Sequence, residues 1–143
     1  MNALHPTEEQ VAGFLAHPKS TEPVFMLNLL KFKARADYDP PTTDEDGDVS
    51  GQTAYGRYAK AFGDMLRERG VEGVETVFGG SANSVLIGDG DAANWDAVAL
   101  VRYPDAQTMF DLVSSDAYRS IHFHRKAGLE GQLLISCDGS GVF

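Results

Sequence analysis

One amide stands at the centre of an apolar run in this sequence. Residues 24–32 read Val-Phe-Met-Leu-Asn-Leu-Leu-Lys-Phe, and Asn28 is that amide. A strand covered on both faces is almost continuously apolar, so the run predicts a buried strand. Because a buried amide needs hydrogen-bond partners, Asn28 is predicted to bind either neighbouring backbone or a tyrosine hydroxyl, or else a small-molecule ligand. Lys31, near the end of the run, is interpreted as a surface charge.

Two tyrosines and an arginine open the next predicted helix. Tyr55 and Tyr58 share its apolar side, which is typical of core residues whose hydroxyls reach water. Alternatively, both hydroxyls meet Asn28 and form a polar spot in an apolar cavity, as in many small-molecule sites. Arg57 is interpreted as facing solvent, with a bidentate bond to a ligand carboxylate as the alternative.

A second group carries a histidine. Tyr118, His122 and Arg125 are spaced i, i+4 and i+7, so a continuous helix would place them on one stripe. The pKa of histidine lies near neutrality, which makes His122 the candidate for proton transfer, with Tyr118 and Arg125 as candidate ligand-binding residues. The alternative for His122 is a partly buried residue that packs at a helix–sheet or dimer contact.

Other kinds of site are poorly supported by the sequence. His122 and His124 would point about 200° apart on a helix, too far for one metal ion. Asp44, Asp46 and Asp48 resemble the start of a calcium loop, but Val49 and Tyr55 stand where that loop needs glycine and a final acid. The sequence also lacks a phosphate-binding glycine motif and a Gly-x-Ser-x-Gly elbow. We therefore expect neither a metal nor a cofactor.

Composition narrows the class of protein. The 143 residues suit one domain, and the net charge of −9 argues against nucleic-acid and anionic-membrane partners. The single cysteine, Cys137, excludes an intramolecular disulfide, and its apolar surroundings in the sequence predict a buried, unreactive thiol. Neither a secretory signal nor an apolar run long enough to span a membrane is seen, so a cytoplasmic location is expected.

The candidate residues depend on a predicted order of elements, whose core spans residues 22–137. In the first half of the chain we predict a helix over 7–17, a strand over 24–33, an acidic loop over 34–51 and a helix over 52–69. Extended segments follow over 71–78 and 84–88, interrupted at Gly79-Gly80, and then a strand over 95–103. The last part is predicted to form helices over 106–114 and from 115 to about 130, a strand over 132–137 and a tail over 138–143. After the short N-terminal helix, this order is β-α-β-β-α-β, which predicts an α+β ferredoxin-like fold with an antiparallel sheet.

Two strands of this sheet are apolar on both faces. A ferredoxin-like subunit covers one face with helices and leaves the other exposed. Residues 24–32 and 97–103 would then expose an apolar surface unless a second sheet covers it. We therefore predict a homodimer in which two sheets close into a barrel.

Two stretches of the sequence carry a recognisable pattern. One is Leu86-Ile-Gly-Asp, then Trp95-Asp-Ala-Val-Ala-Leu-Val-Arg-Tyr-Pro-Asp, Ser115-Asp-Ala-Tyr and Arg125, and the other is Met26-Leu-Asn-Leu-Leu-Lys-Phe32 with Tyr55-Gly-Arg-Tyr58. Over about residues 22–137 they resemble the longer members of a dimeric alpha-beta barrel family, domain of unknown function 1330. The resemblance implies the fold and the dimer, whereas the family has no settled activity.

By analogy with other dimeric alpha-beta barrels, the chain would be a cofactor-independent enzyme that acts on a small organic molecule. His122 would transfer the proton, and Asn28 and the tyrosines would bind the substrate. The alternative is a non-catalytic binding or regulatory module that uses the same cavity.

Overall fold

The computed structural model describes residues 4–39, 47–90 and 94–142. Its elements follow the order α1 (Glu8–Ala16), β1 (Val24–Phe32), α2 (Gly51–Glu68), β2 (Glu75–Ser81), β3 (Ala97–Tyr103), α3 (Ala106–Val113), α4 (Asp116–Arg119), α5 (His122–Gly128) and β4 (Leu129–Asp138). The strands form one antiparallel sheet in the order β2-β3-β1-β4. The predicted α+β ferredoxin-like fold is confirmed.

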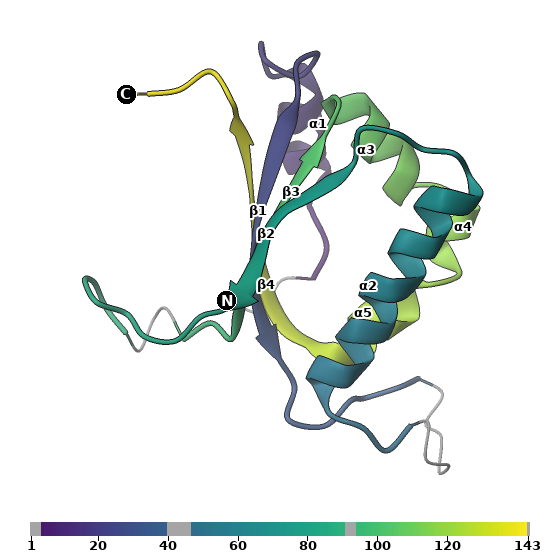
Figure 1. The fold of residues 1–143 in the computed structure, drawn as a ribbon, viewed down its shortest axis with the longest axis vertical. Helices are drawn as coiled ribbons and strands as arrows, with labels where there is room; N and C mark the ends of the chain where they lie inside the picture. Colours follow the sequence, from purple (N-terminus) through teal and green to yellow (C-terminus); the bar gives the residue numbers. More distant parts are fainter. Residues whose placement is uncertain (1–3, 40–46, 91–93, 143) are drawn as a thin grey trace.

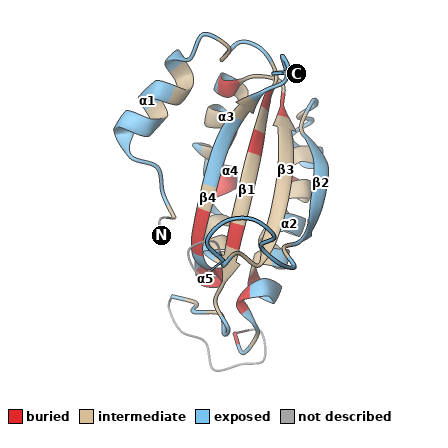
Figure 2. Cartoon of the chain, turned by 90° about the vertical axis from the view of Figure 1, so that its left-hand side faces the viewer, coloured by how far each residue is buried: buried red, intermediate tan, exposed pale blue. Residues whose placement is uncertain are grey.

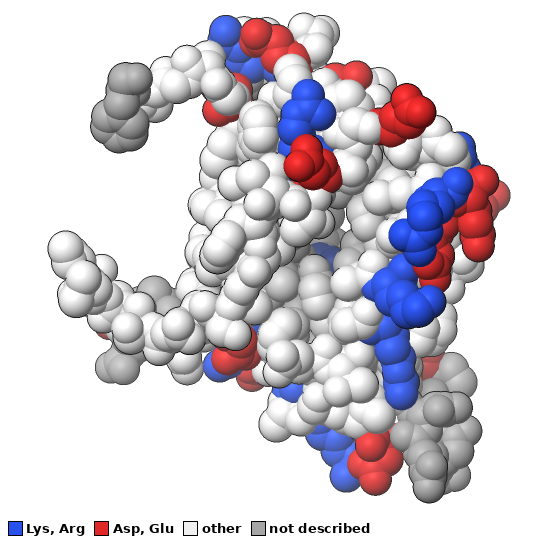
Figure 3. Space-filling view, in the orientation of Figure 1, with Lys and Arg blue, Asp and Glu red and all other residues white. Residues whose placement is uncertain are grey.

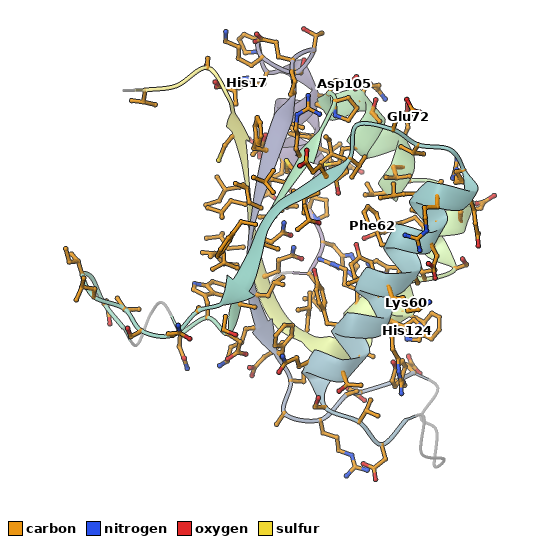
Figure 4. All side chains as sticks on the ribbon, viewed as in Figure 1. His17, Lys60, Phe62, Glu72, Asp105 and His124 are labelled. Atoms are coloured by element: carbon orange, nitrogen blue, oxygen red, sulfur yellow. The ribbon has the colours of Figure 1, made fainter. Side chains whose placement is uncertain are left out.

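The helices α2 to α5 lie on one face of the sheet (Figure 1). Their core contacts Val24 and Met26 of β1 and Tyr103 of β3, together with Met65, Leu112 and Tyr118 from the helices. Phe62 points from α2 into the space between helices and sheet (Figure 4). The even-numbered residues of β1 therefore face the helices, and the odd-numbered residues face the other way.

A side-chain cap stands at the start of most helices. Thr7 and Gln10 form a complete capping box at α1. Ser50 caps α2, and Asp105 caps α3 by accepting a hydrogen bond from the amide of Thr108 at 2.6 Å. The predicted ends of these three helices are correct to within one residue.

The single helix predicted from residue 115 to about 130 is wrong. The chain forms two short helices, α4 and α5, separated at Ser120 and Ile121. The Ser120 hydroxyl donates to the Ala117 carbonyl at 2.6 Å, a local bond that competes with helix continuation. Tyr118 therefore does not share one helical stripe with His122 and Arg125, although the rings of Tyr118 and His122 remain 5.7 Å apart.

The prediction around the first hairpin also needs correction. Strand β2 continues through Gly79 and Gly80, and its register shifts between Thr76 and Phe78 instead. Residues 84–88 do not form a strand, and Leu86 in this loop is 93% exposed. The loop projects from the sheet on the side away from the helices (Figure 1).

The second face of the sheet carries apolar side chains and is not covered by any helix of the described residues (Figures 1 and 2). Strand pairing places its members in adjacent rows, and we call this surface the open face: Phe25, Leu27, Leu29, Phe78, Val98, Leu100, Leu133 and Ile135. Ile135 is 41% exposed and Phe78 is 58% exposed. Cys137, paired with Phe25 at one end of this face, is half-buried, so the prediction of a fully buried thiol is wrong.

Charge is distributed unevenly between the two sides of the molecule. In Figure 3, Lys, Arg, Asp and Glu gather along α2 and at the ends of the fold, whereas the sheet side is mostly uncharged. No helix among the described residues is long and apolar enough to cross a membrane.

Two glycines allow α2 and α5 to touch. A methyl group at Gly128 would lie 2.4 Å from the carbonyl oxygen of Gly51 and 2.9 Å from the amide nitrogen of Tyr55. A methyl group at Gly51 would lie 2.2 Å from the carbonyl oxygen of Lys33. Backbone atoms cannot move aside as side chains can, so both positions require glycine for steric reasons.

Replacing Gly128 by alanine should therefore destabilise the protein. We expect Gly128→Ala to lower the free energy of unfolding by about 1–3 kcal/mol, because the helices must separate. Gly56→Ala is the matched control: Gly56 lies inside α2 with open space around it, so the change should stabilise by roughly 0.5–1 kcal/mol. Urea denaturation measures both, and equal effects of the two substitutions would contradict the steric explanation.

Candidate functional site

Asn28 lies on the helix side of β1, and all its hydrogen bonds are internal. Its amide nitrogen donates to the carbonyl oxygens of Met26 at 3.1 Å and Ala99 at 3.2 Å. Its side-chain oxygen accepts a bond of 2.7 Å from the amide of Gln132 on β4. Of the predicted partners, backbone is found and tyrosine is not. These bonds use both donors of the Asn28 amide.

Arg125 continues this network from α5. One terminal nitrogen, Nη2, donates to Oε1 of Gln132, and the other, Nη1, lies 3.2 Å from Nε2 of His122. An arginine can only donate, which fixes the Gln132 oxygen towards Arg125 and the Gln132 nitrogen towards Asn28. The result is a directed chain of bonds from α5 through β4 to β1. Gln132 is its buried centre, with 8% of its surface exposed.

The same argument fixes the tautomer of His122. Since Arg125 donates to Nε2, that atom accepts, and the neutral ring carries its proton on Nδ1. Burial lowers the pKa of His122 below its ordinary 6.5, and the nearby positive charge of Arg125 adds to this effect. Burial also lowers the pKa of His5, whose ring lies 5.4 Å from that of His122. Both rings therefore favour the neutral form.

The tyrosines form a cluster of their own. The hydroxyls of Tyr58 and Tyr118 share a hydrogen bond of 2.9 Å, and the rings of Tyr55 and Tyr58 lie 5.3 Å apart. Burial raises the pKa of Tyr55 to about 12 and raises that of Tyr58 well above its ordinary value. All hydroxyls with raised pKa stay protonated at neutral pH. The structure shows no bond from Tyr55 or Tyr58 to Asn28, so the predicted polar spot of these three residues is not formed.

Arg57 belongs to a different group on the outer side of the helices. Its Nη1 donates to the Tyr38 hydroxyl at 3.1 Å, and this hydroxyl lies 2.8 Å from Nδ1 of His124. His122 and His124 thus bind different partners, as their spacing predicts. Among the described residues, no three His, Cys, Asp or Glu side chains lie together as a metal site would need. Asp48 forms an ion pair of 2.7 Å with Arg35, whereas Asp44 and Asp46 lie outside the described residues.

An elongated cavity of about 490 Å³ lies between α1, α3 and the free edge of β4. Its walls are mainly apolar, with Val11 and Phe14 from α1, Met26 from β1, and Met109 and Val113 from α3. Arg125, Gln132 and His5 line one end, and His17, Lys19 and Asp138 line the other. Figure 4 shows His17 at one end of the sheet. Helix α1 stands beside β4 and has no buried residue, so it forms an outer wall (Figure 2).

The cavity lining includes one residue of the predicted site, Arg125. Asn28 and His122 lie one hydrogen bond behind the lining, as partners of Gln132 and Arg125. The predicted residues Tyr55, Arg57, Tyr58 and Tyr118 do not line this cavity, and Lys31 forms an ion pair with Asp96 at 3.1 Å.

Sequence reasoning missed Gln132, His5 and Tyr38. Gln132 carries a usable signal, because it is an amide at the start of an apolar run, as Asn28 is at the centre of one. His5 and Tyr38 lie in irregular segments whose position depends on the fold. No spacing rule predicts them.

Comparison with known proteins places the chain in a family. Residues 46–137, well over half of the sequence, match the family described as Domain of unknown function (DUF1330). The chain belongs to this family. The match to DUF1330 contains Arg125, His122 and Gln132, whereas α1 and β1 precede it. No curated protein matches the chain.

Solved structures show how widely the fold is shared. The RPA0582 protein of unknown function from Rhodopseudomonas palustris is 28% identical, with a TM-score of 0.80 over 99% of each chain. A methylated form of RPA0582 gives the same identity and TM-score. At3g17210 from Arabidopsis thaliana is 11% identical, with a TM-score of 0.53 over 84% of this chain and 98% of that one, and this likeness shows the fold alone.

The lowered pKa of His122 makes stability depend on pH. The pKa of His122 is lower in the folded than in the unfolded state. Its contribution to stability is therefore fully present above pH 6.5 and is lost as the pH falls through the folded-state pKa. We therefore expect the free energy of unfolding to decrease as the pH falls below 6.5. In His122→Gln, whose amide oxygen can still accept from Arg125, the decrease should be smaller. Urea denaturation across this pH range tests the prediction, and identical pH slopes would refute it.

Proposed function

We propose that this protein binds a small organic molecule in the cavity beside β4 and acts as a homodimer. The observation that carries the binding role is the cavity itself, with apolar walls and polar groups gathered at its ends. Its volume of about 490 Å³ falls within the range of roughly 300–1,000 Å³ common for small-molecule sites. A largely apolar ligand would gain from burial along α1 and α3.

The open face supports the homodimer. Its apolar rows cross all four strands, and a surface of this kind on a soluble protein usually meets a partner. A second copy offers the same apolar rows, which a two-fold arrangement would bring together. The loop after β2 and the C-terminal tail both project beside this face, where they would flank a partner sheet (Figures 1 and 3). The cytoplasmic location expected from the sequence is also part of this proposal.

A catalytic role for His122 is the second candidate. It rests on the position of His122, one hydrogen bond from the cavity-lining Arg125. As a base, however, His122 would have to use Nε2, which accepts from Arg125, because Nδ1 carries the proton. We favour the binding role because it leaves the hydrogen bonds between Arg125, His122 and Gln132 unchanged.

Filling the cavity should abolish binding. Gly13 lines the cavity from α1, and a Cβ added there meets no atom of another element within 4 Å, so Gly13→Phe should place its ring in the cavity. We expect wild-type protein to bind the neutral fluorescent probe N-phenylnaphthylamine with saturation at one probe per subunit. Gly13→Phe should weaken this binding at least tenfold, and Ala12→Phe, on another side of α1, should not. Equal binding by both variants would show that the probe binds elsewhere.

A charge introduced on the open face by substitution tests whether this face forms the dimer contact. Ile135 is 41% exposed in the single chain, so Ile135→Glu should leave the subunit folded while opposing association through the cost of burying a carboxylate. We expect a dimer for the wild type and a monomer for Ile135→Glu by size-exclusion chromatography with light scattering. Phe123→Glu on the helix side, 49% exposed in the native protein, should remain dimeric. A wild-type monomer at micromolar concentration would contradict the proposal.

A further inference from the structure

Arg125 is a positive charge held by neutral partners. Its two bonds go to His122 and Gln132, and the structure shows no carboxylate within ion-pair distance of it among the described residues. A guanidinium has five N–H groups, so most of them remain for water or a ligand. In a chain with a net charge of −9, a partly buried cation that lacks an acidic partner is unusual.

The two ends of the cavity differ in charge. At the Arg125 end the other lining groups are Gln132 and His5, both without negative charge. At the opposite end Asp138 lines the cavity near Lys19, and Lys19 also forms an ion pair of 3.2 Å with Glu22, so two carboxylates share one lysine there. An anionic group is therefore attracted to the Arg125 end and repelled from the other.

The shape of the cavity adds a second constraint. Gln132 and Asp138 mark its ends along β4, about 20 Å apart at ~3.3 Å per strand residue. The walls between them are mainly apolar, with Ser136 as a polar residue of β4, so the space suits an unbranched or flat hydrocarbon body lying along the strand.

We propose that the ligand of this cavity is an amphipathic carboxylic acid, whose carboxylate binds Arg125 and whose apolar body extends along β4 towards Asp138. The inference rests on the proposed binding function and specifies its ligand class. A planar carboxylate matches the paired N–H groups of one guanidinium, and its single charge matches the single cation. His5 lines the same end of the cavity, and a neutral imidazole has one N–H donor for a further bond. Arg125 is the one cation among the described residues that line this end, so a phosphate dianion would meet one lining cation with two charges.

The test is displacement of N-phenylnaphthylamine by decanoate and by decanol, which share a chain and differ in charge. In wild-type protein, decanoate should displace the probe at a concentration at least roughly tenfold lower than decanol does. Arg125→Gln should remove this difference while the probe and decanol still bind. Arg119→Gln, an equal charge change at an exposed residue outside the cavity, should preserve it. Arg125→Lys keeps the charge, so it should retain part of the preference.

The outcomes separate the two proposals. If the probe, decanol and decanoate all fail to bind the wild type, the proposed binding function is wrong. If decanol and decanoate displace the probe equally, or decyl phosphate does so better than decanoate, the carboxylate inference alone is overturned. It is also overturned if Lys19→Gln, and not Arg125→Gln, removes the preference for decanoate. Should Arg125→Gln fail to fold, full decanoate preference in wild type and its reduction in Arg125→Lys decide the question.

Discussion

The contact between Gly51 and Gly128 determines where the helix layer meets the sheet. Because neither residue has a side chain, α2 and α5 approach until backbone atoms touch, and the chain then enters β4 at the next residue, Leu129. This abrupt change from helix to strand holds Arg125, just before it, against Gln132, just after it. The candidate site therefore depends on a steric feature that carries no chemistry of its own.

From this junction a directed set of hydrogen bonds crosses the sheet. Arg125 donates to Gln132, Gln132 donates to Asn28, and Asn28 donates to backbone carbonyls of β1 and β3. Each amide is satisfied, so burying them costs little, and the guanidinium is fixed in orientation without losing its charge. A cation held in place by neutral groups still attracts an anionic ligand. In a cation paired with a carboxylate, that attraction is already satisfied within the protein.

The sequence predicted the parts of the fold that depend on local patterns. The starts of α1, α2 and α3 lie within one residue of the prediction, and there Thr7, Ser50 and Asp105 each accept a hydrogen bond from an amide three residues away. The continuous apolar run around Asn28 correctly indicated a strand, and the structure places it between β3 and β4 with one face open. The break between α4 and α5 was missed because the Ser120 hydroxyl forms a local bond that competes with the helix. The spacing of apolar residues carries no signal of this competition.

The sequence by itself determined most of the elements, their order and the apolar character of both faces of β1 and β3, since these follow from interactions between residues close along the chain. It also marked Asn28 as a polar group in need of partners and Arg125 as a candidate ligand-binding residue. Only the tertiary structure decided that the partner of both is Gln132, that the tyrosines bind one another, and that α1 closes a cavity beside β4. Those contacts join residues distant in sequence, whose meeting depends on strand register and on the close approach of two helices.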